Sequence, residues 1–224
     1  VKDLVKNPLV SEGIHYVHDE DDILIGRALI IGPENTPYAK GYYFFKFKFP
    51  PDYPYSPPLV TYHTNDGVTR FNPNLYRNGK VCLSLLNTWE GEKWSACQSI
   101  RSILLTLQMT MNENPLLNEP GVHEQHHFAN IRKYNQIIEY KNIELTILKY
   151  NLDPSMIPIQ TEEKNEIKKT IHQHFKNTFE RIVEKIKENK EKEMNKSVVK
   201  MGIYSQEALL NYDILLQQCE QWNK

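Results

Sequence analysis

A lone cysteine preceded by an asparagine is the strongest chemical signal in this chain. Cys82 and Asn74 lie eight positions apart, and the segment between them contains a turn. A thiol is the side chain best suited to hold an acyl group as a labile thioester. An amide brought beside it can donate a hydrogen bond to the oxyanion that forms when the thioester is attacked. The pair therefore predicts an acyl carrier.

The other two cysteines predict no further chemistry. Cys97 and Cys219 are interpreted as small buried hydrophobic residues on the apolar faces of helices. Three widely spaced cysteines form neither a disulfide framework nor a Cys-x-x-Cys metal site. This pattern indicates a reducing compartment, so we expect the cytoplasm, with the nucleus as a second location.

One histidine motif needs its own interpretation. His123-Glu124-Gln125-His126-His127 has the His-Glu-x-x-His pattern of zinc peptidases, in which two histidines one helical turn apart bind zinc and the glutamate acts as base. Here the motif follows Pro120-Gly121 in a polar loop, and no third ligand is evident. We therefore expect no metal, and no bound nucleotide cofactor is implied either.

Size and charge narrow the class of protein. A chain of 224 residues can form one well-buried core with an appendage. The formal net charge of −1 provides no basic field for nucleic acid, so we expect protein partners. The longest apolar runs, such as Ala28-Leu29-Ile30-Ile31, are far short of the roughly 20 residues that cross a bilayer. We expect no membrane association and no secretory signal, and a fragment boundary is plausible at Val1.

Three stretches in the first third of the chain predict strands joined by short turns. They are 23–31, 42–49 and 59–64. In the second stretch Phe45, Phe47 and Phe49 alternate with lysines, which predicts one buried face and one face in water. Successive strands with short connections favour an antiparallel meander and an α+β fold.

Helical periodicity follows. Ser95-Ala96-Cys97-Gln98 has the form of a capping box, which predicts a helix from Trp94-Ser95 to about Asn114-Pro115. A second helix is predicted over 131–150 and ends at Asp153-Pro154.

The C-terminal third predicts a helical extension of a core domain, with the boundary between residues 1–152 and 153–224. Residues 162–195 carry one apolar stripe at steps of three or four, and residues 206–222 carry another. The segment 198–205 between them contains Gly202, so the two could form a helical hairpin. The stripes could bind a partner, but docking on the chain's own core is favoured because exposed stripes of this length promote aggregation.

The order of motifs resembles the ubiquitin-conjugating enzymes, and among them the Z-type group with a C-terminal extension. The general motifs are Gly32-Pro33-Glu34-Asn35-Thr36-Pro37-Tyr38, 49–58, Asn72-Pro73-Asn74, Cys82 and Trp94-Ser95. The Z-type phrases are 70–74, 77–84, 88–91, 112–115 and 118–121. The resemblance covers about 4–150.

The resemblance implies an antiparallel four-stranded sheet with flanking helices, on which Cys82 accepts ubiquitin from an activating enzyme. The modifier would then pass to a lysine of a protein substrate or to the cysteine of a ubiquitin ligase. Asn74 would brace the loop or donate to the oxyanion, and Glu119 would orient or deprotonate the incoming lysine. The Z-type group is similar in using an alternative activating enzyme and, in vertebrates, a tandem ubiquitin-like modifier as well.

Tyr55, Ser95 and Ala96 match the two loops that ligases grip. Two residues depart from the family pattern: Asn72 replaces the usual histidine of its motif, and Ala96 replaces a proline common in the ligase-facing loop.

Two alternative functions stay open. One is the conjugating module of a giant inhibitor-of-apoptosis-type hybrid, and the other is a non-catalytic scaffold of the same fold. Such scaffolds lack the cysteine, so Cys82 argues against the second.

Overall fold

Four strands form an antiparallel meander whose spatial order is the order of the sequence. The computed structural model describes residues 4, 6–19, 21–159, 164–192 and 195–223. The strands are β1 (Ile14–His18), β2 (Ile25–Ile31), β3 (Tyr42–Lys48) and β4 (Leu59–Tyr62). Ala28 pairs with Phe45, which in turn pairs with Tyr62. The four-stranded α+β fold is confirmed, although β1 had not been located because two histidines interrupt its alternation.

The helices and short turns complete the core. The α-helices are α2 (Ile100–Thr110), α3 (Glu124–Lys141) and α4 (Lys149–Leu152), and a π-helical segment, η4 (Asn142–Leu148), joins the last two. The 3-10 turns of this part are η1 (Val10–Glu12), η2 (Ser84–Leu86), η3 (Pro115–Asn118) and η5 (Pro154–Met156). Buried residues of α2 and α3 pack with Phe45 and Phe47 of β3 in one hydrophobic core.

The start of α2 differs from the predicted one. Ser99 caps this helix through a capping box with Ser102, so the helix begins at Ile100. Gln98 instead closes a turn onto the Ser95 carbonyl at 2.9 Å. Cys97 consequently lies exposed in the preceding loop, and its prediction as a buried helical residue was wrong. The helix also ends earlier, at Thr110.

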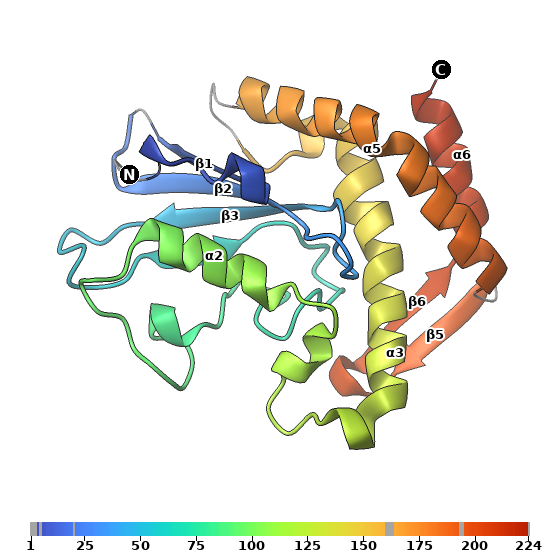
Figure 1. Ribbon diagram of the computed structural model, residues 1–224, viewed down its shortest axis with the longest axis horizontal. Helices are drawn as coiled ribbons and strands as arrows, with labels where there is room; N and C mark the ends of the chain where they lie inside the picture. The colour runs from blue at the N-terminus through green and yellow to red at the C-terminus, as the bar shows by residue number, and fades with distance from the viewer. Residues whose placement is uncertain (1–3, 5, 20, 160–163, 193–194, 224) are drawn as a thin grey trace.

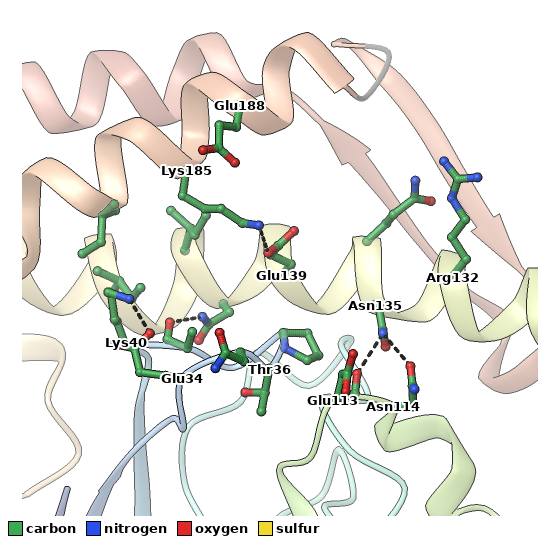
Figure 2. Close-up of a pocket in the computed structure, with 18 of the residues that line it drawn as sticks. Glu34, Thr36, Lys40, Glu113, Asn114, Arg132, Asn135, Glu139, Lys185 and Glu188 are labelled. Atoms are coloured by element: carbon green, nitrogen blue, oxygen red, sulfur yellow. Dashed lines mark hydrogen bonds and ion pairs between the residues drawn. The ribbon is translucent and has the colours of Figure 1, made fainter.

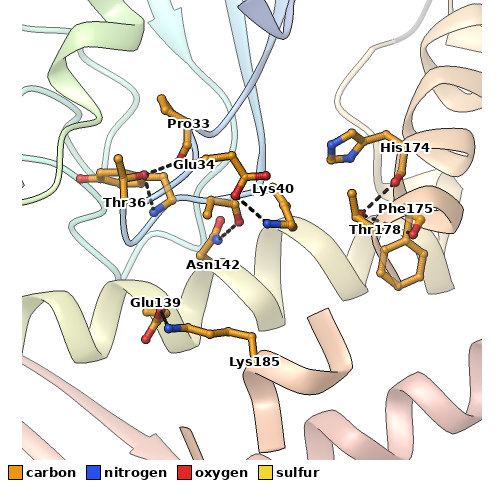
Figure 3. Close-up of polar contacts among 12 residues, drawn as sticks. Pro33, Glu34, Thr36, Lys40, Glu139, Asn142, His174, Phe175, Thr178 and Lys185 are labelled. Atoms are coloured by element: carbon orange, nitrogen blue, oxygen red, sulfur yellow. Dashed lines mark hydrogen bonds and ion pairs between the residues drawn. The ribbon is translucent and has the colours of Figure 1, made fainter. Parts of the chain in front are cut away.

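Asn142, at the start of the π-helical segment, ties the helices to the sheet (Figure 3). Its Nδ2 donates to the Ala39 carbonyl at 2.9 Å. Its Oδ1 accepts from Tyr43 at 2.6 Å and from Thr146 at 2.7 Å. Every polar atom of this buried amide is therefore used, as a buried polar group requires. Asn142 lies so close to Gly41 that a side chain would not fit there, because a Cβ would lie 1.8 Å from Asn142 Oδ1.

The C-terminal extension packs against the core with two helices and a β-hairpin. Its elements are α5 (Lys164–Lys192), β5 (Ser197–Met201), η6 (Ile203–Ser205), β6 (Gln206–Leu210) and α6 (Tyr212–Trp222). Figure 1 shows α5 and α6 side by side, with the hairpin along α3. Phe175, Ile182 and Ile186 are buried in the main core, so the apolar stripe of α5 is covered by the chain itself.

A helix over 206–222 was predicted, but its first part is strand β6. Gln206, Ala208 and Leu210 are buried while the residues between them are exposed, which is the period of two of a strand. The last helix begins only at Tyr212, where Asn211 caps it by accepting from the Ile214 amide. The preceding long helix was predicted over 162–195. Residues 162–163 and 193–194 of that range lie outside the described residues, and residue 195 lies in a turn.

The second face of the sheet is only partly in water. Leu29, Tyr42 and Phe44 form a second apolar cluster with Ile167 and Ile171 of α5. The exposed lysines of β3 confirm the predicted wet face at one end of the strand, whereas the extension covers the other end.

A polar cavity of about 740 Å³ lies between α3, α5 and the turn before β3. Figure 2 shows Lys185 of α5 reaching Glu139 of α3, above Glu34 and Thr36 of the turn. The Lys185–Glu139 ion pair spans 3.0 Å, and Asn189 donates to the same carboxylate at 2.9 Å. These contacts help to hold the extension on the core. Among the residues that line this cavity, none belongs to the predicted catalytic set.

We predict that Gly41→Ala destabilises the fold. Its Cβ would lie 1.8 Å from Asn142 Oδ1 and 2.4 Å from Thr146 Oγ1, so the buried network must shift. Overpacking of this kind costs about 1–3 kcal/mol, or roughly 2–12 °C in Tm for a chain of this size. Thermal unfolding followed by circular dichroism measures the change. Gly202→Ala is the matched control, since a Cβ there meets no described atom within 4 Å, and equal shifts for the two variants would contradict the prediction.

Candidate active site

Asn74 and Cys82 are joined by two reciprocal hydrogen bonds. The Cys82 amide donates to the Asn74 carbonyl at 2.8 Å, and Asn74 Nδ2 donates to the Cys82 carbonyl at 2.8 Å. The structure therefore brings together the two residues that the spacing had paired. Asn74 Nδ2 carries a second hydrogen that this contact does not use.

The turn between these two residues depends on glycine. Gly79 has φ +87°, its amide donates to the Tyr76 carbonyl at 2.9 Å, and Asn78 accepts from the Lys80 amide at 3.1 Å. A Cβ at Gly79 would lie 2.9 Å from the Tyr62 carbonyl oxygen of β4. The positive φ and the short distance to Tyr62 both favour glycine at this position. The turn brings the chain back beside Asn74, so that Cys82 can hydrogen-bond to it.

Asn72 holds in place the loop of residues 72–82, which carries Asn74 and Cys82. It is fully buried, its Oδ1 accepts from the Asn74 amide at 2.9 Å, and its Nδ2 donates to Tyr38 and to the Thr110 carbonyl, each at 2.8 Å. Burial raises the pKa of Tyr38 well above its usual value, so its phenol stays neutral. Asn72, which replaces the usual histidine of the motif that this loop resembles, acts here as a fixed brace that carries no charge.

Cys82 itself is only 2% exposed. The segment after it folds back on the site, because the Thr88 hydroxyl accepts from the Leu83 amide at 2.9 Å and lies 2.9 Å from the Val81 carbonyl. Gly91, at φ +119°, then passes so close to Ser84 that a Cβ would lie 3.2 Å from the Ser84 Cβ. The neighbouring part of the chain therefore packs closely around Cys82.

Glu119 does not touch Cys82, but it flanks the same loop. The Thr110 carbonyl accepts from both Asn72 and Asn118, the residue before Glu119, at 2.8 and 2.9 Å. Glu119 itself is half-buried, and its Oε2 accepts a hydrogen bond from Tyr204 of the extension. Sequence reasoning missed Tyr204, because it had placed this residue in a connecting segment.

The predicted ligase-facing residues lie on two exposed loops. Tyr55 is 81% exposed, and Ser95 and Ala96 are exposed as well. Trp94 links the loops by donating from Nε1 to the Pro54 carbonyl at 2.7 Å. The two loops therefore form one surface that is joined by Trp94.

The histidine motif is not arranged as a metal site. Nδ1 of His127 lies 3.1 Å from both the backbone nitrogen and the carbonyl oxygen of His123. The part of the chain that the structure describes contains no group of three or more His, Cys, Asp or Glu side chains placed to hold a metal ion. No helix within the described residues is both long enough and apolar enough to cross a membrane.

Comparison with known proteins agrees with this architecture. Residues 2–144, more than half of the chain, match the family model described as ubiquitin-conjugating enzyme. The chain belongs to the ubiquitin-conjugating enzyme family. The solved E2 domain of a Toxoplasma gondii ubiquitin conjugating enzyme is similar with a TM-score of 0.51 and 27% identity, covering 65% of this chain and 94% of that one.

Curated relatives confirm the Z-like resemblance. The human ubiquitin-conjugating enzyme E2 Z is 47% identical over 136 residues, which are 60% of this chain and 38% of that protein. The Xenopus tropicalis E2 Z is 46% identical over the same length, covering 44% of its own chain. This family member thus spans about two fifths of the length of these relatives. The human dual E2 ubiquitin-conjugating enzyme/E3 ubiquitin-protein ligase BIRC6 is 38% identical over 179 residues, 75% of this chain and 4% of that protein, consistent with the hybrid alternative.

We predict that the three cysteines differ sharply in reactivity. Cys97 is exposed, whereas Cys219 is 2% exposed and its burial raises its pKa to about 11, so only about one molecule in a thousand is thiolate at pH 8. Iodoacetamide should modify Cys97 first and Cys219 last, as peptide mass spectrometry over time would show. Cys97→Ser should remove the fast phase, and early labelling of Cys219 would disagree with its burial.

Proposed function

We propose that this chain carries ubiquitin or a ubiquitin-like modifier as a thioester on Cys82. The observation that carries the proposal is the pair of hydrogen bonds that fixes Asn74 against Cys82. The Cys82 thiolate attacks the modifier's C-terminal thioester on an activating enzyme, a new C–S bond forms, and the activating enzyme's thiolate leaves. No metal or bound cofactor takes part in this exchange.

The second step passes the modifier onward. A lysine amine of a protein substrate attacks the thioester carbonyl, the C–N bond forms, and Cys82 leaves as thiolate. With a ligase that has its own cysteine, the ligase thiolate attacks the thioester carbonyl in place of the amine, and the modifier passes to the ligase as a new thioester. Asn74 Nδ2 keeps the loop in place through the Cys82 carbonyl and has one hydrogen left for the oxyanion. Glu119 receives the lysine's proton or orients its amine.

The exposed surface made by Tyr55, Ser95 and Ala96 supports contact with a ligase. The loops are rigidly linked through Trp94 and Pro54, so a partner would meet a preformed surface. Because the carrier thiol must stay reduced, we further propose that these reactions take place in the cytoplasm, with the nucleus as a second compartment.

Charging of Cys82 is the first test. Incubation with an activating enzyme, ATP and ubiquitin should give an adduct on a non-reducing gel that thiol reductant removes. Cys82→Ala should abolish the band, and Cys97→Ser, which removes the more exposed thiol, should leave it unchanged. Absence of an adduct with every activating enzyme tried would support the scaffold alternative, and an adduct that survives Cys82→Ala would place the chemistry elsewhere.

Asn74→Ala tests the amide. We expect charging within about twofold of the unaltered chain, whereas discharge onto free lysine should fall roughly 100-fold, the range seen when one oxyanion donor is lost. Single-turnover assays that separate the two steps measure both rates. Equal losses in charging and discharge would show that Asn74 acts only as a brace of the loop.

A further inference from the structure

The β5–β6 hairpin contacts residues around Asn74 and Cys82 at three points. The Tyr204 hydroxyl donates to Glu119 Oε2. Arg77, from the turn before Cys82, donates to the Tyr204 carbonyl at 2.7 Å. Gln206, which is buried, accepts from the Arg70 amide at 2.7 Å. A segment of the extension therefore contacts both sides of the predicted site.

Arg70 couples this turn to the loop that carries Asn74. Its guanidinium lies 3.4 Å from the centroid of the Tyr76 ring and 5.1 Å from that of Tyr204. The same side chain donates to the Asn72 carbonyl at 3.0 Å and to the Pro73 carbonyl at 2.7 Å. A cation held between two aromatic rings has little freedom, so it fixes these backbone carbonyls relative to Tyr204.

The backbone at Tyr204 is unusual for its residue type. Tyr204 has φ +65° and Ser205 has φ +47°, in the left-handed region that bulky residues rarely adopt. Glycine or asparagine would serve a plain turn better. A tyrosine in this conformation is held by its surroundings, here Arg77 on its carbonyl and Glu119 on its hydroxyl.

The phenol is a permanent donor. Burial, together with the hydrogen bond and charge of Glu119, raises the pKa of Tyr204 far above its usual value, while Arg70 opposes this only in part. The phenol therefore keeps its proton and donates it in the hydrogen bond to Glu119 Oε2. Within the part of the chain that the structure describes, the hydrogen bond from Tyr204 engages Glu119 Oε2 and leaves Oε1 available.

We propose that Tyr204 is a positioning residue for transfer to lysine, which places a residue of the C-terminal extension in the discharge step. Its phenol fixes Glu119 Oε2, so that Oε1 can accept a hydrogen from the attacking amine. The amine forms the C–N bond, the C–S bond breaks toward Cys82, and the released proton goes to the Glu119 carboxylate and then to water. This inference rests on the proposed function of Cys82.

The test is Tyr204→Phe in the full chain, which keeps the ring beside Arg70 and removes only the hydroxyl. Charging with ubiquitin should stay within about twofold, and discharge onto free lysine should slow by roughly three- to tenfold, the size of one typical net hydrogen bond, because Tyr204 acts on the amine only through Glu119. Discharge onto hydroxylamine should change much less, because its weakly basic nitrogen is unprotonated at neutral pH and, once the C–N bond forms, gives up its proton readily to water without a carboxylate to accept it. Glu119→Gln should show the same selectivity, and the double variant should be no slower than Glu119→Gln alone.

Tyr140→Phe is the matched control, since Tyr140 donates to the Asn211 carbonyl of the extension at 3.4 Å without touching Glu119. It should leave all rates unchanged. If Tyr204→Phe charges normally and its discharge onto lysine is unaltered or faster, the role of Tyr204 is overturned, whereas the proposed function of Cys82 stands. Equal slowing with lysine and hydroxylamine would also overturn it, because that pattern indicates a general distortion. An unaltered chain that cannot be charged would overturn the function of Cys82 and this inference together.

Discussion

The two hydrogen bonds between Asn74 and Cys82 set the position of everything else in the site. They hold the thiol-bearing residue against an amide across a turn that only glycine can make at Gly79. Asn72 supports the pair from the core, so the loop is determined on both sides by buried polar contacts. Buried hydrogen bonds that reinforce one another in this way favour a single arrangement of the backbone.

The C-terminal extension contacts both the core and the loop that carries Asn74 and Cys82. It covers part of the sheet's second face, forms an ion pair with α3, and contacts the turn before Cys82 through its hairpin. Arg70, Arg77 and Glu119 all form hydrogen bonds with the hairpin. The core and its appendage therefore share contacts in both the apolar interior and the site.

The sequence allowed some of this to be predicted, for identifiable reasons. The alternation in β3 and the spacing of Asn74 and Cys82 are local patterns, so they led directly to the strand and to the paired residues. The capping residue of α2 was misplaced because Ser95 and Ser99 both suit a cap, and only the backbone conformation selects Ser99. β6 was mistaken for helix because Leu209 and Tyr212 also match helical spacing. The contact of Tyr204 with Glu119 joins residues 85 positions apart, which no local pattern encodes.

The cover that α5 places on the sheet has a consequence for synthesis of the chain. Leu29, Tyr42 and Phe44 are made early, but Ile167 and Ile171, which bury them, come much later. Translation from Phe44 to Ile167 takes roughly 6–25 s at about 5–20 residues per second. During that interval the nascent sheet exposes an apolar patch that chaperones, or other nascent chains on the same message, can bind.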